Sequence, residues 1–174
     1  RGQPGGAGRR GWIHHRPVAR LGHADHLSNL AVAAELRHHG RLPGDRKELL
    51  RVLRPSGGLL ALSGLPQARL AQLITGSALA ESTTTKPSAE LLLAKRNPRE
   101  GAGEGTHTDG TAAQTSNSGD EIVNGRRMAL QWFGKPGARG MIDRQGRNPP
   151  PLTSNGLLYV QGDNRIWGQD AFNG

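Results

Sequence analysis

The sequence predicts an α/β fold in its first half, followed by β-strands alone at its C-terminal end. Between residues 12 and 96, apolar runs of strand length alternate with segments of helical periodicity, which is typical of a sheet covered by helices. Residues 155–174 carry a hairpin pattern, and a stretch rich in Gly, Thr, Ser and Asn separates the two parts. We therefore expect a disordered lead-in at 1–11, an α/β part at 12–96, a linker at 97–126 and a β part at 127–174.

Composition limits how much core the chain can build. Of its 174 residues only 34% are hydrophobic, whereas Gly contributes 26 and Pro 11. Such a composition predicts long irregular stretches. The formal charge of +9 and pI of about 11.3 would suit a nucleic acid or another anionic partner, but the basic residues are spread along the chain. We therefore keep nucleic-acid binding only as a second alternative.

Several classes of site and location are excluded or left open by residue type. The absence of cysteine excludes disulfides, thiolate metal sites and cysteine nucleophiles, and it leaves the redox compartment open. No apolar run is long enough to span a bilayer. Because the chain begins at Arg1 with neither an initiating Met nor a signal core, we expect it to be an internal fragment, and its localisation is left open.

The elements of the α/β part follow from local signals. Residues 12–15 and 27–33 are expected strands, and Asp45 is the expected N-cap of a helix that places Leu49, Leu50 and Leu53 on one face. Glycines 57 and 58 end that helix. The remaining expected elements are a strand at 59–63, a helix at 67–74 with Pro66 in its first turn, and a hairpin of 79–85 with 90–95 around residues 86–89.

Residues 50–60, LRVLRPSGGLL, resemble the passage that joins a helix to the fifth strand in class I (Rossmann-like) S-adenosylmethionine-dependent methyltransferases. Residues 24–32 are similar to the start of their fourth strand, and residues 78–95 to their terminal hairpin. The resemblance implies an incomplete Rossmann-like methyltransferase half at 12–96. It places Glu35, just after the fourth-strand candidate, as a remnant of the cofactor-binding site, although a plain surface carboxylate is the simpler interpretation.

The departures from that family argue against catalysis by this chain. The first strand, its glycine-rich cofactor loop and the acidic residue after the second strand would all lie before Trp12, and Arg16 stands where many relatives have an acidic residue. A second glycine-rich segment, residues 100–105, imitates a nucleotide loop. It is separated from the preceding strand and no helical pattern follows it, so we interpret it as linker. We expect no bound cofactor in this chain. For the parent protein, S-adenosylmethionine or a quinone is left open as a cofactor.

Residues 155–174, NGLLYVQGDNRIWGQDAFNG, predict a hairpin closed by a further turn. They resemble the repeat of PQQ-like β-propellers, whose blades end in an Asp-Ala-x-x-Gly turn. Together with residues 101–107, 118–120, 130–137 and 141–144, they are similar to a bacterial family in which a methyltransferase-like segment precedes such a propeller. The resemblance implies β-strands of an incomplete β-propeller blade, whose natural partner is the remainder of its own propeller.

No catalytic or metal-binding constellation is predicted. His23, Asp25 and His26 are too few to specify a zinc site, so solvated or capping histidines are the preferred interpretation. Trp132, within an expected strand at 128–133, and Trp167 are expected in the core. Asp143 with Arg144 is interpreted as an ion pair or a contact at the propeller mouth.

Three functions remain open at this stage. The first is a non-catalytic fragment of a PQQ-like β-propeller protein that serves ligand or partner binding in its parent. The second is a methyltransferase whose cofactor loop is supplied by upstream sequence. The third is a basic nucleic-acid-binding protein, whose affinity would depend steeply on salt.

Overall fold

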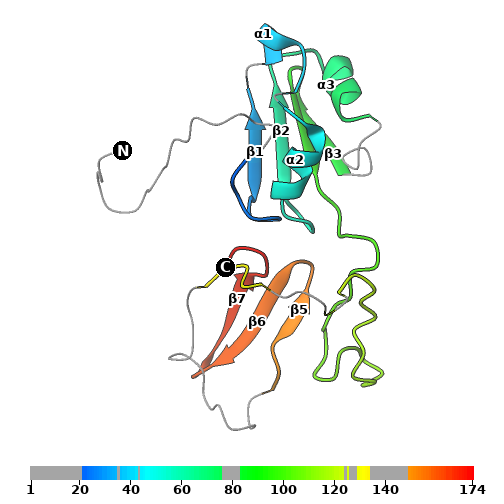
Figure 1. Ribbon diagram of the computed structural model, residues 1–174, viewed down its shortest axis with the longest axis vertical. Helices are drawn as coiled ribbons and strands as arrows, with labels where there is room; N and C mark the ends of the chain where they lie inside the picture. The colour runs from blue at the N-terminus through cyan, green and yellow to red at the C-terminus, as the bar shows by residue number, and fades with distance from the viewer. Residues whose placement is uncertain are drawn as a thin grey trace, which may run out of the picture.

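The computed structural model describes residues 21–34, 36–42, 44–75, 83–123, 125, 129–133 and 149–174. In these residues the chain forms a four-stranded mixed sheet with short helices and a separate three-stranded antiparallel sheet (Figure 1). The α/β class of the first part and the β-strands of the last part are thereby confirmed. The expected lead-in at 1–11 and the expected strand at 12–15 lie outside the described residues.

The first sheet combines a parallel pair with an antiparallel hairpin. Strand β1 (Leu30–Ala33) runs parallel to β2 (Leu59–Ser63), and β2 pairs antiparallel with β4 (Leu91–Lys95). Strand β3 (Thr83–Ser88) pairs only with β4, so the strand order is β1-β2-β4-β3. Strand β4, the last of these four in the sequence, therefore lies inside the sheet, and β3, the strand before it, lies at the edge.

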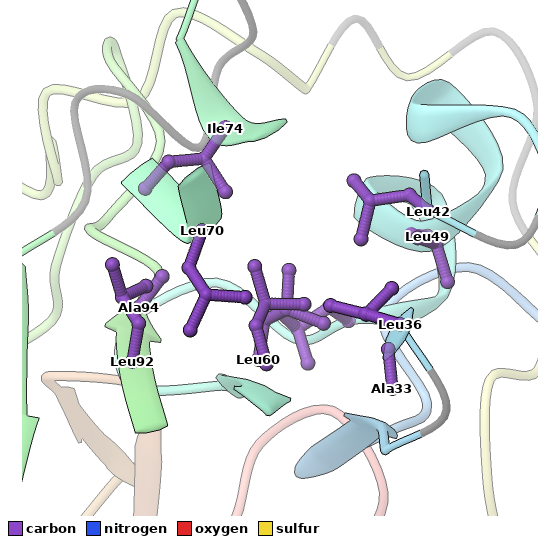
Figure 2. Close-up of a cluster of buried hydrophobic side chains, with 11 residues drawn as sticks. Ala33, Leu36, Leu42, Leu49, Leu60, Leu70, Ile74, Leu92 and Ala94 are labelled. Carbon is purple, nitrogen blue, oxygen red and sulfur yellow. The ribbon is translucent and has the colours of Figure 1, made fainter. Parts of the chain in front are cut away.

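Three helices cover one face of this sheet: α1 (Leu36–His39), α2 (Arg46–Val52) and α3 (Gln67–Ile74) (Figure 1). Alternate strand residues point to this face because side chains alternate along a strand. On the other face of β1, Leu30 and Val32 are 56% and 63% exposed. The buried cluster consists of Ala33, Leu36, Leu42, Leu49, Leu53, Leu60, Leu62, Leu70, Ile74, Leu92 and Ala94 (Figure 2).

Helix α2 begins at its predicted N-cap but ends at Val52, two residues before the end of the predicted helix at 46–54. The Asp45 side chain accepts a hydrogen bond of 2.9 Å from the Lys47 amide, which satisfies one of the unpaired amides of the first turn. The helix ends at Val52, and a tight turn with Ser56 and Gly57 at positive φ leads into β2. Gly58 is required in this turn because a Cβ atom there would lie 2.3 Å from the Arg54 carbonyl oxygen.

The second sheet is an antiparallel meander of β5 (Leu152–Ser154), β6 (Leu157–Gly162) and β7 (Arg165–Asp170). Asn155 and Gly156, both at positive φ, form the two-residue turn between β5 and β6. The predicted hairpin is present, with longer strands than the sequence indicated.

Several elements differ from the sequence prediction. Helix α1 and strand β5 were not predicted, since each is too short to show a period. The turn between β3 and β4 lies at residues 89–90 and not at 86–89, so Pro87 falls within a strand. Proline is tolerated there because β3 is an edge strand with an irregular register at this point.

The predicted strand at 128–133 is wrong for the residues that the structure describes there. Residues 129–133 form no strand, and Leu130 and Phe133 are 80% and 91% exposed. Trp132 is held differently: its indole Nε1 donates to the Ala171 carbonyl oxygen at 3.0 Å, and Gly174 packs against its ring. Gln131 Nε2 also donates to the Asp25 carbonyl oxygen at 2.5 Å. Two side chains therefore hold this short run, which has no sheet partner among the described residues.

Candidate functional site

The parallel pair β1–β2 gives the first sheet two chemically different ends. The carboxyl ends of the strands lead to Ala34 and Gly64, and the amino ends follow Asn29 and Gly58. Open α/β sheets bind small ligands at the carboxyl ends of their parallel strands. The end near Ala34 is therefore the expected place for a ligand site.

A cavity of about 770 Å³ lies at this carboxyl end of β1. Its size is in the range of small-molecule sites, on the order of 300–1,000 Å³. Its apolar wall is continuous with the core, because Ala33, Leu36 and Leu42 are buried and belong to the core cluster (Figure 2). The lining consists of Val32, Ala33, Ala34, Leu36, His39, Arg41, Leu42 and Gly44.

The polar side chains of the lining, His39 and Arg41, are exposed. No carboxylate occurs among the described lining residues, and in the described part of the chain neither His39 nor Arg41 forms an ion pair. Nearby Arg37 differs, because its guanidinium is paired with Glu90. Among the described lining residues, the cavity therefore has buried apolar residues and one cationic side chain, Arg41, without an ion-pair partner.

Glu35, the residue that the sequence places near a cofactor, lies outside the described residues. Its neighbours Ala34 and Leu36 both line the cavity. The role of Glu35 in cofactor binding stays a prediction.

The opposite end of the parallel pair is covered by the C-terminal turn of the chain, residues 170–174 (Figure 1). The Asn173 side-chain amide donates to the Leu27 carbonyl oxygen at 2.9 Å and to Asn29 Oδ1 at 2.8 Å. The Phe172 ring packs edge-on against His26, with the ring centroids 5.9 Å apart. The amino end of β1 is thus in direct contact with the second sheet.

An ion pair supports the same contact. Arg54 Nε lies 3.0 Å from Asp170 Oδ2, and the two side chains are only 17% and 14% exposed. Arg54 Nε and Nη1 are buried without a well-aligned acceptor among the described residues, so Asp170 acts mainly as a countercharge. Gly156 closes over the pair, since a Cβ atom there would lie 3.2 Å from Arg54 Nη1 and 3.0 Å from Ser56 Cβ.

Arg96 connects His26 to the end of α2. Its Nη1 donates to the carbonyl oxygens of Leu50, at 2.7 Å, and of Leu53, which lie at the C-terminal end of the helix. The same Nη1 lies 3.3 Å from His26 Nδ1. A guanidinium only donates, so Nδ1 is the acceptor and the imidazole is neutral. Burial lowers the pKa of His26, and the nearby charges of Arg96 and Arg99 lower it further.

The glycine-rich segment at 100–105 is bonded to other parts of the chain. The Gly103 amide donates to Asp120 Oδ2 at 3.0 Å, and the Gly105 amide donates to Thr153 Oγ1 at 2.8 Å. Hydrogen bonds from the amides of Val123 and Gly103 lower the pKa of Asp120. The Asp120 carboxylate therefore accepts from the Gly103 amide, a donor that a phosphate loop would offer to a bound anion.

Other sequence candidates contribute no reactive centre. Within the described residues, no group of three or more His, Asp or Glu side chains is placed to hold a metal ion. Trp167 is half-buried beneath the guanidinium of Arg165, which lies 5.4 Å from the ring centroid. Asp143 and Arg144 lie outside the described residues. None of the helices in the described part of the chain is long and apolar enough to cross a membrane.

A second cavity, of about 870 Å³, opens on one face of the second sheet. Tyr159 and Ile166 are its exposed apolar residues, at 38% and 75% exposure. Its lining consists of Thr108, Pro149, Pro150, Leu152, Tyr159, Gln161, Gly162, Asn164, Arg165 and Ile166.

The contact residues at the amino end of β1 were not predicted as a group. Arg54 and Asp170 each belong to a recognisable phrase, LRVLRPSGG and DAFNG, but nothing in either phrase indicates that the two meet. Arg96 gave no signal beyond its place after an apolar strand.

No protein-family model, no curated protein and no solved structure matches the chain. The case for a function therefore depends on the geometry of the chain itself.

Proposed function

We propose that the chain is a non-catalytic part of a larger protein, in which an incomplete Rossmann-like methyltransferase half is docked to the first strands of a PQQ-like β-propeller. Its role is to bind a ligand or partner at the carboxyl end of β1. In this proposal the amino end of the parallel pair is structural, and the carboxyl end remains accessible.

The arrangement of the first sheet supports the methyltransferase-like half. A parallel pair is followed by an antiparallel hairpin whose last strand, β4, lies beside β2. This is the placement expected if residues 78–95 are the closing hairpin of such a sheet. The turn at residues 54–58 leads directly into β2, as the resemblance of LRVLRPSGGLL requires.

The second sheet supports the propeller-like part. The terminal turn is well formed, because Asp170 Oδ1 accepts from the Phe172 amide at 2.9 Å and the Gly174 amide donates to the Asp170 carbonyl oxygen at 3.0 Å. In the described part of the chain, the outer edge of β7 pairs with no strand. A propeller blade that lacks some of its strands would leave the edge of its last strand unpaired in the same way.

The observation that carries the proposal is the contact between the two parts. Asp170 and Asn173 of the DAFNG turn reach Arg54 and Asn29, at the amino end of the parallel pair. Because the two parts share a partly buried ion pair, they form one structural unit and are not joined by the linker alone. It also leaves the carboxyl-end cavity free for a ligand.

The lack of a strand beside β1 supports a non-catalytic role. Among the described residues, the outer edge of β1 has no partner, and no helix covers Leu30 and Val32. The cofactor loop of a Rossmann-like enzyme follows a strand of the sheet and opens a helix. The described part of this chain contains no such strand–loop–helix unit next to the cavity.

The direct test is calorimetric titration of S-adenosylmethionine into the full chain, with a complete class I methyltransferase as the positive control. We expect saturable heat from the control and none from the chain. Saturable binding to the chain would overturn the non-catalytic proposal and favour the methyltransferase alternative.

A further inference from the structure

We propose that protonation of His26 releases the terminal turn, residues 170–174, from the first sheet. Docking of the two sheets on each other therefore weakens in mild acid, where a histidine changes its charge. The inference concerns the amino end of β1 and goes beyond the proposed function, because it holds whether or not a ligand binds at the carboxyl end.

The His26 side chain lies where the two parts of the chain meet. Its backbone amide donates to the Arg51 carbonyl oxygen at 2.7 Å, which anchors the residue to the last turn of α2. The Phe172 ring of the terminal turn packs edge-on against the imidazole, with the ring centroids 5.9 Å apart. The imidazole is therefore held by the first part of the chain and provides packing surface for the second.

This arrangement requires a neutral imidazole. Arg96 Nη1 lies 3.3 Å from His26 Nδ1, and a guanidinium only donates, so Nδ1 must accept and carries no proton. A proton on Nδ1 would point an N–H group at another N–H group and would bring two positive charges together. In agreement with this geometry, burial and the charges of Arg96 and Arg99 hold the pKa of His26 below its ordinary value.

Arg96 is fixed in its place beside the ring. Its Nη1 donates to the carbonyl oxygens of Leu50 and Leu53, at the C-terminal end of α2. Withdrawal of the guanidinium would leave these carbonyl groups without that donor. The His26 ring is therefore the group that moves when it takes up a proton, and Phe172 then loses the surface on which it packs.

The carboxylates on either side of the contact are already engaged. Asp25 favours a charged imidazole, but its Oδ1 is bound by Arg51 Nη1 at 2.6 Å. In the terminal turn, Asp170 Oδ2 lies 3.0 Å from Arg54 Nε, and Asp170 Oδ1 accepts from the Phe172 amide at 2.9 Å. Neither carboxylate can turn to an imidazolium without giving up a bond that it makes now.

Release of the terminal turn exposes the His26 ring to water and thereby favours its protonated form. The pKa of His26 is lowered in the docked chain and returns toward the ordinary 6.5 in the released chain. The released chain therefore takes up the proton first, so docking is complete above pH 6.5 and weakens as the pH falls toward the lowered value. One proton changes the docking equilibrium by at most about tenfold per pH unit.

Nuclear Overhauser spectroscopy of the isotope-labelled full chain at pH 7.5 and pH 5.5 tests the proposal. The cross-peak between the Asn173 side-chain amide and Asn29 reports docking without involving His26. We expect its intensity to fall at least about twofold at the lower pH, while the cross-strand peaks of β2 with β4 persist. Equal intensity at both pH values would overturn the proposal, and loss of both sets of peaks together would show unfolding instead of release.

The variant His26→Asn separates this ring from the other titrating groups. Asparagine tolerates the φ of 61° and does not titrate in this range, so its Asn173–Asn29 cross-peak should have the same intensity at both pH values. His38→Asn is the matched control, because it removes an exposed histidine of α1 and should keep the decrease. A decrease in His26→Asn as large as that in the unmodified chain would overturn the role of His26.

A second measurement does not require either variant to dock. In the unmodified chain, the loss of the Asn173–Asn29 cross-peak should follow the titration of the His26 ring protons, with the same midpoint. A midpoint that matches another histidine, and not His26, would contradict the proposal.

Discussion

Asp170 provides the countercharge for Arg54 at the place where the two sheets meet. The substitution Asp170→Asn keeps an acceptor for the Phe172 amide but removes the negative charge beside the guanidinium. Since both side chains are mostly buried, we expect the free energy of unfolding to fall by about 1–3 kcal/mol, between the values for exposed and fully buried pairs. Urea unfolding followed by tryptophan fluorescence measures the change.

The control for this variant is Glu90→Gln, which breaks the exposed pair with Arg37. It should cost less than about 0.5 kcal/mol, because exposed pairs contribute little. Equal effects of the two substitutions would show that the Arg54–Asp170 contact does not stabilise the folded chain.

His26 makes the stability of the chain depend on pH. Its pKa lies below the usual 6.5 because burial, Arg96 and Arg99 disfavour the imidazolium, while Asp25 acts weakly in the opposite direction. The neutral ring is therefore favoured in the folded chain, and its contribution is complete above pH 6.5. It is lost as the pH falls from about 6.5 toward the lowered value, because the unfolded chain takes up the proton first.

The variant His26→Asn tests this dependence, since asparagine tolerates the positive φ of 61° at this position. We expect the free energy of unfolding to decrease less between pH 7.5 and pH 5.5 in the variant than in the unmodified chain. The other histidines are common to both proteins, so the difference isolates His26. Identical pH dependence in the two proteins would be evidence against a neutral, buried ring.

At the scale of elements, the β5–β6 turn packs at Gly156 against Arg54 and Ser56, in the turn that leads into β2. The substitution Gly156→Ala places a methyl group 3.0–3.2 Å from Ser56, Arg54 and Phe172 and forces alanine to a φ of 75°. We expect a loss of about 2–3 kcal/mol in unfolding free energy, combining backbone strain with displacement of the contact.

Gly119→Ala is the matched control for the backbone term. Its φ is 71° and no atom lies within 4 Å of the added methyl group. It should therefore show the strain alone, on the order of 1 kcal/mol. A loss as large as that of Gly156→Ala would mean that the turn is not pressed against the first sheet.

The elements also show what sequence patterns resolve. Strand β2 and helix α3 have the predicted bounds. In β2 the alternate residues Leu60 and Leu62 point into the core, and in α3 Leu70 and Ile74, one turn apart, point into the same core. The run at 128–133 misled because apolar composition favours a strand only where a partner strand exists. Helix α1 and strand β5 are too short for periodicity, and both depend on contacts made elsewhere in the chain.

The candidate site illustrates the same limit. The sequence predicts a remnant of a cofactor site at Glu35, which lies outside the described residues. Arg41 gave no signal, because a lone arginine in a loop has no pattern. The contacts of Asn173 with Leu27 and Asn29 span more than 140 positions, and local rules do not reach that far.

At the scale of the whole molecule, the two ends of the parallel pair have different tasks. The amino end is closed by the terminal turn, which fixes the second sheet to the first. The carboxyl end carries the cavity, which is where an α/β sheet binds its ligands. We propose that a chain organised in this way binds a ligand at one end of the parallel pair and holds its second sheet at the other.

The central claim is that the terminal turn is docked on the first sheet, and nuclear Overhauser spectroscopy of the isotope-labelled full chain tests it most directly. The account predicts cross-peaks between the rings of Phe172 and His26, whose centroids are 5.9 Å apart, and between the Asn173 side-chain amide and Asn29. Two sheets that tumble independently, with neither set of cross-peaks in a chain that is otherwise folded, would contradict the account.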